Sequence, residues 1–181
     1  MTDQSTLPTV AVFSLGGTIA STNTGSAAPS GGVSPRLGAR ELVAAVPQLQ
    51  DVAQVETIAF RQVASGDLAF ADLVELAQEI DKRFEAGLDG VVITQGTDSI
   101  EETAFALELL VRGTSPVVVT GAMRNPTLAG PDGPANLLAA VQVAAAPEAA
   151  GLGPLVVLRR INDPRRPLRP RPQGRHLLQR D

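Results

Sequence analysis

Residues 71–94 read ADLVELAQEIDKRFEAGLDGVVIT and combine a helix signal with a strand signal. Over 71–86 the apolar side chains recur every three or four positions and charged side chains occupy the opposite face, which is typical of an amphipathic helix. The apolar positions are Leu73, Leu76, Ala77, Ile80 and Phe84. Gly87 is suited to end this helix, and the apolar run Gly90–Thr94 predicts a strand covered on both faces. A helix followed at once by a buried strand indicates an α/β fold.

The same alternation continues on both sides of that stretch. Further strands are predicted at Val10–Leu15, Val55–Val63, Pro116–Thr120 and Pro154–Leu158, and further helices at Gly38–Ala45, Ser99–Val111 and Ala135–Ala145. This order predicts a Rossmann-like, mostly parallel sheet with helices on both faces. Only Ser21–Pro35 lacks apolar periodicity, so we expect a long connection without regular structure there. Such a connection is usually functional or mobile, and the alternative is a tolerated surface insertion.

The composition excludes several classes of protein. The chain has 181 residues, 44% of them hydrophobic, with five Phe, no Trp, no Tyr and no Cys. Without cysteine there are no disulfides and no zinc–thiolate site. No apolar run approaches the ~20 residues that span a bilayer, and the N-terminal run is too short for a signal peptide. We therefore expect a cytoplasmic globular protein that is not bound to a membrane.

Charge divides the chain into two parts. Residues 159–181 hold eight Arg and two Asp, a net charge of +6, whereas residues 1–158 hold 7 basic and 17 acidic side chains, a net charge of −10. We predict an α/β domain over 1–158 and a disordered Arg/Pro-rich tail over 159–181. Alternating Arg and Pro is what GC-rich DNA encodes out of frame, so one hypothesis is a frameshift product. Nucleic-acid binding by the tail is the alternative. The negative charge of residues 1–158 and the lack of aromatic side chains in the tail argue against it.

Two predicted strands end in segments that could carry chemistry. Ligands of open parallel sheets bind beyond the carboxyl ends of the strands. The first strand runs into Leu15-Gly16-Gly17-Thr18 and the third into Gln95-Gly96-Thr97-Asp98. If the two strands are close in the sheet, Thr18 and Thr97 face one crevice, which favours acyl transfer through a threonine over a plain binding domain.

These two segments also fit other interpretations. Neither matches a nucleotide-binding loop, and no metal-ligand spacing is present, so no cofactor is expected. Ser99 and Glu102 have the spacing of a capping box, so Thr97, Asp98 and Ser99 could simply begin a helix. Capping explains one of these side chains but not two hydroxyls and a carboxylate together.

Five segments, in order, resemble the N-terminal domain of the two-domain bacterial L-asparaginases of the asparaginase/glutaminase family. They are Ser14–Ala20 (SLGGTIA), Ala64–Asp67 (ASGD), Thr94–Thr103 (TQGTDSIEET), Val119–Arg124 (VTGAMR) and Asp132–Leu137 (DGPANL). The resemblance covers residues 9–158 and stops where the Arg/Pro-rich tail begins. It implies hydrolysis of the asparagine side-chain amide to aspartate and ammonia.

The resemblance also implies a role for individual residues. Thr18 would be the nucleophile that forms an acyl-enzyme. Thr97 would activate or relay protons, and Asp98 would bind the substrate ammonium group. Ser65 and Gly66 would hold the α-carboxylate, and the backbone at Ala122 would contact the side-chain amide. Ser21–Pro35 would be a lid that closes over the substrate.

The chain departs from the family pattern at several positions. Gln95 stands where many members have His, and Gly66 where many have Gln. The lid has no tyrosine. Family members use a lysine downstream of the fifth strand to couple the second threonine to the aspartate, whereas the only lysine here is Lys82, on the predicted surface helix.

The C-terminal domain of the family, which completes the site of a neighbouring subunit in a homotetramer, is not found in this sequence. The alternative to an active asparaginase is therefore a truncated fragment with little or no activity. The expected partner is a small molecule, L-asparagine and possibly L-glutamine, without nucleic acid. The family homo-oligomer is in doubt for this chain.

Overall fold

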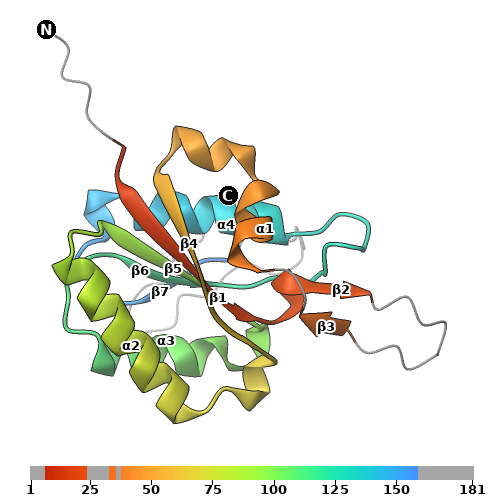
Figure 1. The fold of residues 1–181 in the computed structure, drawn as a ribbon, viewed down its shortest axis with the longest axis horizontal. Helices are drawn as coiled ribbons and strands as arrows, with labels where there is room; N and C mark the ends of the chain where they lie inside the picture. The colour runs from red at the N-terminus through yellow and green to blue at the C-terminus, as the bar shows by residue number, and fades with distance from the viewer. Residues whose placement is uncertain (1–6, 24–32, 36–37, 159–181) are drawn as a thin grey trace, which may run out of the picture.

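The computed structural model describes residues 7–23, 33–35 and 38–158 (Figure 1). Its centre is a five-stranded sheet built from β1 (Thr9–Gly16), β4 (Gln54–Val63), β5 (Gly90–Thr94), β6 (Val117–Thr120) and β7 (Leu155–Val156). The strand order is β4-β1-β5-β6-β7, and every neighbouring pair is parallel. The predicted α/β class and mostly parallel sheet are confirmed.

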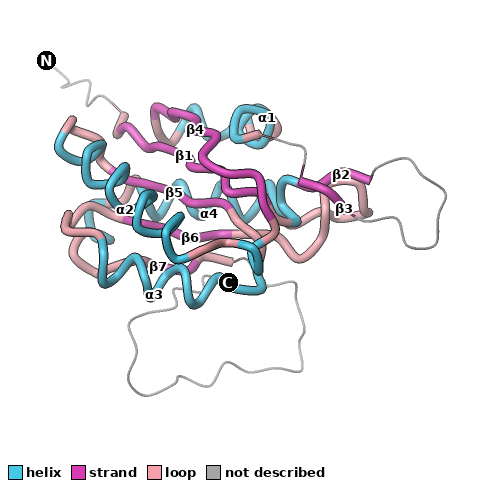
Figure 2. Tube along the Cα trace, turned by 60° about the horizontal axis from the view of Figure 1, so that its bottom comes forward, coloured by secondary structure: helices cyan, strands magenta, loops and turns pink. Residues whose placement is uncertain are grey.

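Two layers of helices cover the sheet, as Figures 1 and 2 show. One face carries α1 (Ala39–Ala44) and α4 (Gly133–Ala144), and the other carries α2 (Phe70–Glu85) and α3 (Ile100–Leu110). Alternating side chains of β1 supply both cores: Val10 and Val12 pack on the α1/α4 side, Ala11 and Phe13 on the α2/α3 side. Because both faces are covered, β1 and β5 are buried along almost their whole length, which explains their continuous apolar sequences.

The helices and sheet strands lie close to their predicted positions, but one prediction was wrong. Ser21–Pro35, expected to have no regular structure, contains a short antiparallel pair formed by β2 (Ser21–Asn23) and β3 (Val33–Pro35). Short strands can be held by pairing and by packing against neighbours, here the turn after β1, without an apolar repeat of their own. The tail predicted over 159–181 lies outside the described residues.

Within the described ranges, no helix is both long and apolar enough to cross a bilayer.

Candidate active site

Four connections meet at one edge of the sheet. β1 leads into the 3₁₀ turn Thr18–Ala20, β4 into the turn Ser65–Asp67, β5 into the turn Thr97–Ser99, and β6 into residues 121–124. Since β4, β1, β5 and β6 are consecutive in the sheet and parallel, their carboxyl ends lie at the same edge. The predicted site residues all belong to these four connections.

The connections after β1 and β5 are in contact through glycine. Gly16 and Gly17 have φ values of +106° and +79°, a region that side-chain-bearing residues rarely adopt. A Cβ atom at Gly17 would overlap the backbone of Gly96. Thr18 and Thr97 each follow directly from this contact, and both side chains are half-buried.

Ser65 joins the connection after β4 to the same point. It is buried, and a Cβ atom at Gly96 would lie only 2.6 Å from Ser65 Oγ. The Ser99 hydroxyl donates a hydrogen bond to the Ser65 carbonyl (2.9 Å) and makes none to the first turn of α3. The predicted capping box at Ser99 and Glu102 was therefore wrong: this hydroxyl links two connections across the sheet edge.

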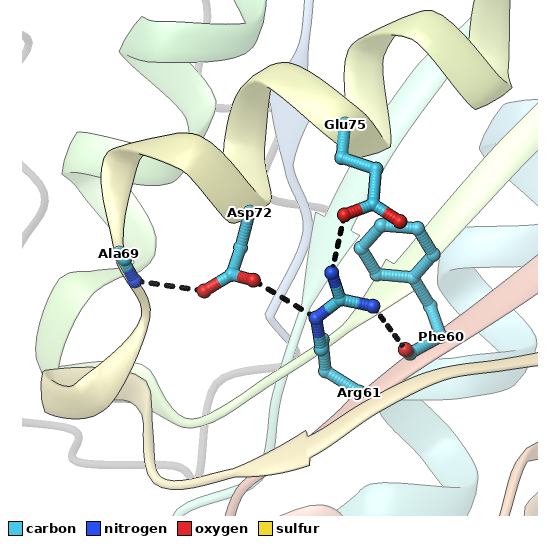
Figure 3. A network of polar contacts seen from close by, with 5 residues as sticks. All are labelled: Phe60, Arg61, Ala69, Asp72 and Glu75. Carbon is cyan, nitrogen blue, oxygen red and sulfur yellow. Dashed lines mark hydrogen bonds and ion pairs between the residues drawn. The ribbon is translucent and has the colours of Figure 1, made fainter.

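An ion-pair network fixes the strand and helix on either side of Ser65 and Gly66 (Figure 3). Arg61, near the end of β4, donates through Nε to Asp72 (2.9 Å) and through Nη2 to Glu75, both in α2. Asp72 also accepts the Ala69 N–H (3.0 Å), which caps α2. The bonds from Arg61 and from the Ala69 N–H lower the pKa of Asp72. The bonds to Asp72 and Glu75 raise the pKa of Arg61. The ends of the turn that carries Ser65 and Gly66 are thus held by charge-assisted bonds.

The connection after β6 is held by two residues to which the sequence-based predictions gave no role. Asp132 accepts the backbone N–H groups of Met123 (3.0 Å) and Arg124 (2.9 Å). Asn136 Nδ2 donates to the Gly121 carbonyl (2.9 Å) and to Asp132 (3.2 Å). A carboxylate and an amide four residues apart at the start of an apolar helix were the available signal, because side chains at that spacing meet.

Ala122 belongs to this connection and lies in the same buried cluster as Ile19, in the turn after β1. It is buried, and a methyl group at Gly133 would approach both Ala122 (3.7 Å) and Ile19 (3.1 Å). By contrast, Asp98 and Gly66 are exposed, so polar groups and open backbone line the outer part of this edge. In the part of the chain that the structure describes, no cluster of three or more His, Asp or Glu side chains could hold a metal ion.

Comparison with known proteins agrees with this architecture. A family model described as "Asparaginase, N-terminal" matches residues 9–165. The chain belongs to the asparaginase family. It is 40% identical over 153 residues to L-asparaginase 2 of Bacillus subtilis, covering 84% of this chain and 41% of that protein. It is 38% identical over 150 residues to the glutaminase-asparaginase of Acinetobacter glutaminasificans, covering 82% and 45%.

A solved asparaginase structure shares the fold. The crystal structure of a probable cytoplasmic L-asparaginase from Campylobacter jejuni superposes with a TM-score of 0.75 at 38% identity, over 83% of this chain and 45% of that one. The chain thus spans less than half the length of the asparaginases it matches. The matched part is the N-terminal domain, as the resemblance predicted; the domain boundary at residue 158 stays a prediction.

The only lysine of this asparaginase-family chain lies away from the candidate site. Lys82 is in the last turn of α2, and α2 runs back from the edge where the four connections meet. The Lys82 side chain is 71% exposed, and its ammonium nitrogen lies 3.8 Å from a carboxylate oxygen of Glu79. Lys82 therefore belongs to the solvent-facing surface of α2, as predicted.

Proposed function

We propose that this chain is an amidohydrolase that converts L-asparagine to L-aspartate and ammonia, with L-glutamine as a second substrate. Two findings support the proposal: membership of the asparaginase family, and the contact of Gly17 with Gly96 immediately before Thr18 and Thr97. The contact supports the proposed mechanism, because Thr18 and Thr97 are far apart in the sequence and each directly follows one of the two glycines. The cytoplasm is the proposed location.

In the proposed reaction, Thr18 Oγ attacks the side-chain carbonyl carbon of asparagine and gives up its proton. The tetrahedral intermediate collapses, the C–N bond breaks, and ammonia leaves with a proton, which produces an ester between Thr18 and the acyl group. Water then attacks the ester, releases aspartate and restores the hydroxyl. A threonine hydroxyl reacts this way only when a neighbouring group accepts its proton, and Thr97 is proposed to relay it.

The remaining residues are proposed to hold the substrate. Asp98 is exposed and carries the charge that suits an α-ammonium group. Ser65 and Gly66 offer a hydroxyl and open backbone for the α-carboxylate, and a side chain at Gly66 would meet nothing within 4 Å. The backbone at Ala122 would contact the amide. Such positioning converts a bimolecular attack into an intramolecular one, which supplies a large part of enzymatic rate enhancement.

A catalytically impaired fragment is the second candidate, and the position of Lys82 favours it. The ammonium group of Lys82 faces Glu79 and is not available to assist Thr97 and Asp98. Loss of one member of a catalytic set commonly lowers the rate by about 10³-fold or more. The two candidates therefore predict different turnover from the same folded protein.

The test is ammonia release from L-asparagine and L-glutamine by the full chain, by Thr18→Ala, and by the matched control Thr114→Ala, an exposed threonine distant from the site. The proposal expects turnover in the full chain, a loss of about 10³-fold or more in Thr18→Ala, and no change in the control. No turnover by folded, monodisperse protein supports the impaired fragment. Turnover that survives Thr18→Ala excludes Thr18 as the nucleophile.

A further inference from the structure

Gln95 directly follows β5 (Gly90–Thr94) and precedes Gly96, which contacts Gly17. Its side chain is 1% exposed, and its backbone N–H donates to the Thr120 carbonyl of the neighbouring strand β6 (3.0 Å). A buried glutamine immediately after the middle strand of the sheet is unusual, because amide side chains are mostly exposed. The role of this side chain therefore depends on the contacts of its nitrogen, Nε2, and its oxygen, Oε1.

The two polar atoms of the Gln95 side chain differ. Nε2 donates a hydrogen bond to the Gly96 carbonyl (3.2 Å). Oε1 is buried and accepts no hydrogen bond from any residue that the structure describes. A buried acceptor without a partner destabilises a fold, and methionine would fill nearly the same volume without it. Compared with methionine, the glutamine side chain therefore adds one favourable interaction, the hydrogen bond from Nε2 to the Gly96 carbonyl.

Three other connections touch the backbone of Gln95 and Gly96. A Cβ atom at Gly17 would overlap the Gly96 backbone, and a Cβ atom at Gly96 would lie 2.6 Å from Ser65 Oγ. A Cβ atom at Gly121, on the connection after β6, would lie 2.8 Å from the Gln95 carbonyl oxygen. A rotation of the Gly96 peptide would displace Thr97 and Asp98, which follow it directly, relative to Thr18.

We propose that Gln95 is a positioning residue: its amide fixes the Gly96 peptide and thereby sets the placement of Thr97 and Asp98 against Thr18. This inference rests on the proposed function for its effect on turnover, but the fixing of the peptide does not depend on catalysis. Gln95 itself is buried beneath the edge and touches no reacting atom.

Two substitutions separate this role from simple packing. Gln95→Met keeps the volume and removes the donor. Gln95→Glu keeps the shape, but the ionised carboxylate has no donor and repels the Gly96 carbonyl. Burial raises the pKa of the introduced carboxyl group, and its protonated form again donates a hydrogen bond. Gln78→Met, on the exposed face of α2, is the matched control.

The first measurement is hydrogen exchange at the backbone amide of residue 95, which donates to the Thr120 carbonyl, in the ligand-free full chain, followed by mass spectrometry or NMR at several pH values. We expect exchange at this amide, after correction for intrinsic rates, to be about tenfold faster in Gln95→Met than in the unsubstituted chain, a change of about 1.4 kcal/mol in local opening. In Gln95→Glu the same acceleration is expected at pH 8 and disappears as the pH falls. Unchanged exchange in both variants overturns the proposal.

The second measurement is the kinetics of ammonia release. A small misplacement of reacting groups costs up to about 100-fold in rate, so kcat is expected to fall ten- to 100-fold in Gln95→Met with KM within about threefold. Gln95→Glu is expected to recover activity toward acidic pH, which a packing defect would not do. If the unsubstituted chain shows no turnover, the proposed function fails, and hydrogen exchange alone then decides the role of Gln95. Equal kcat in all variants, with turnover present, contradicts the proposal.

Discussion

The contact between Gly17 and Gly96 predicts that Gly17→Ala damages both stability and the site. Two separate effects act at this position. Gly17 has a φ of +79°, where an L-residue with a Cβ atom costs about 1–2 kcal/mol. The added methyl group would also overlap the Gly96 backbone, and overpacking costs about 1–3 kcal/mol. The sum is a loss of about 2–5 kcal/mol of unfolding free energy, a large part of the ~5–15 kcal/mol that a domain possesses.

Two glycines of the same chain serve as matched controls. Gly87 also has a positive φ, +96°, but a Cβ atom there meets nothing within 4 Å, so Gly87→Ala measures the backbone effect alone. Gly66 has neither the unusual φ nor a close neighbour, so Gly66→Ala is expected to change stability by less than about 0.5 kcal/mol. The difference between Gly17→Ala and Gly87→Ala isolates the effect of the contact.

The assay is urea unfolding followed by circular dichroism, with the free energy taken from the midpoint and slope. We expect the order of destabilisation to be Gly17→Ala, then Gly87→Ala, then Gly66→Ala. If Gly17→Ala is no more destabilising than Gly87→Ala, the two connections are not in the tight contact on which the candidate site depends.

Two further predictions concern the bonds beside this contact. Ser99→Ala removes the hydrogen bond to the Ser65 carbonyl and is expected to lower the free energy of unfolding by about 1 kcal/mol in the same urea assay; no change would mean that water replaces the hydroxyl without loss. Asp72→Asn tests pH dependence. The pKa of Asp72 is lowered from 3.8 by Arg61, so its contribution to stability is present above that ordinary value and is lost as the pH falls through the lower folded-state pKa. The variant should therefore be less stable at neutral pH, and its deficit should shrink as the pH falls below 3.8; a deficit that is constant with pH would contradict the ion-pair explanation.

The main elements of this fold were predictable because their signals are local. The repeat of Leu73, Leu76 and Ile80 marks α2, and the continuous apolar run of β5 reflects burial on both faces. The order of elements then predicts a parallel sheet, which places Thr18 and Thr97 at one edge. These inferences need only the helical period of about 3.6 residues, the continuous apolar runs of buried strands, and the rule that ligands bind beyond the carboxyl ends of parallel strands.

The missed features depend on partners far away in the sequence. The spacing of Ser99 and Glu102 cannot be told from a capping box until Ser65 is seen to take the hydroxyl. β2 and β3 are only three residues each, so neither has room for a repeat. Asn136 is a polar residue in an apolar helix; its spacing from Asp132 suggests their hydrogen bond, but its bond to the Gly121 carbonyl is visible only in the fold.

The meeting of four connections at one edge means that no short stretch of this chain contains the candidate site by itself. Phe13 and Thr94, on neighbouring strands, are 81 positions apart, so the site exists only after the parallel strands have assembled. A small molecule held across Gly17 and Gly96 would act as a non-covalent crosslink between distant parts of the polypeptide. Its affinity would add directly to the resistance of the whole sheet to unfolding, so ligand occupancy would protect the chain from heat and proteolysis as well as serve its chemistry.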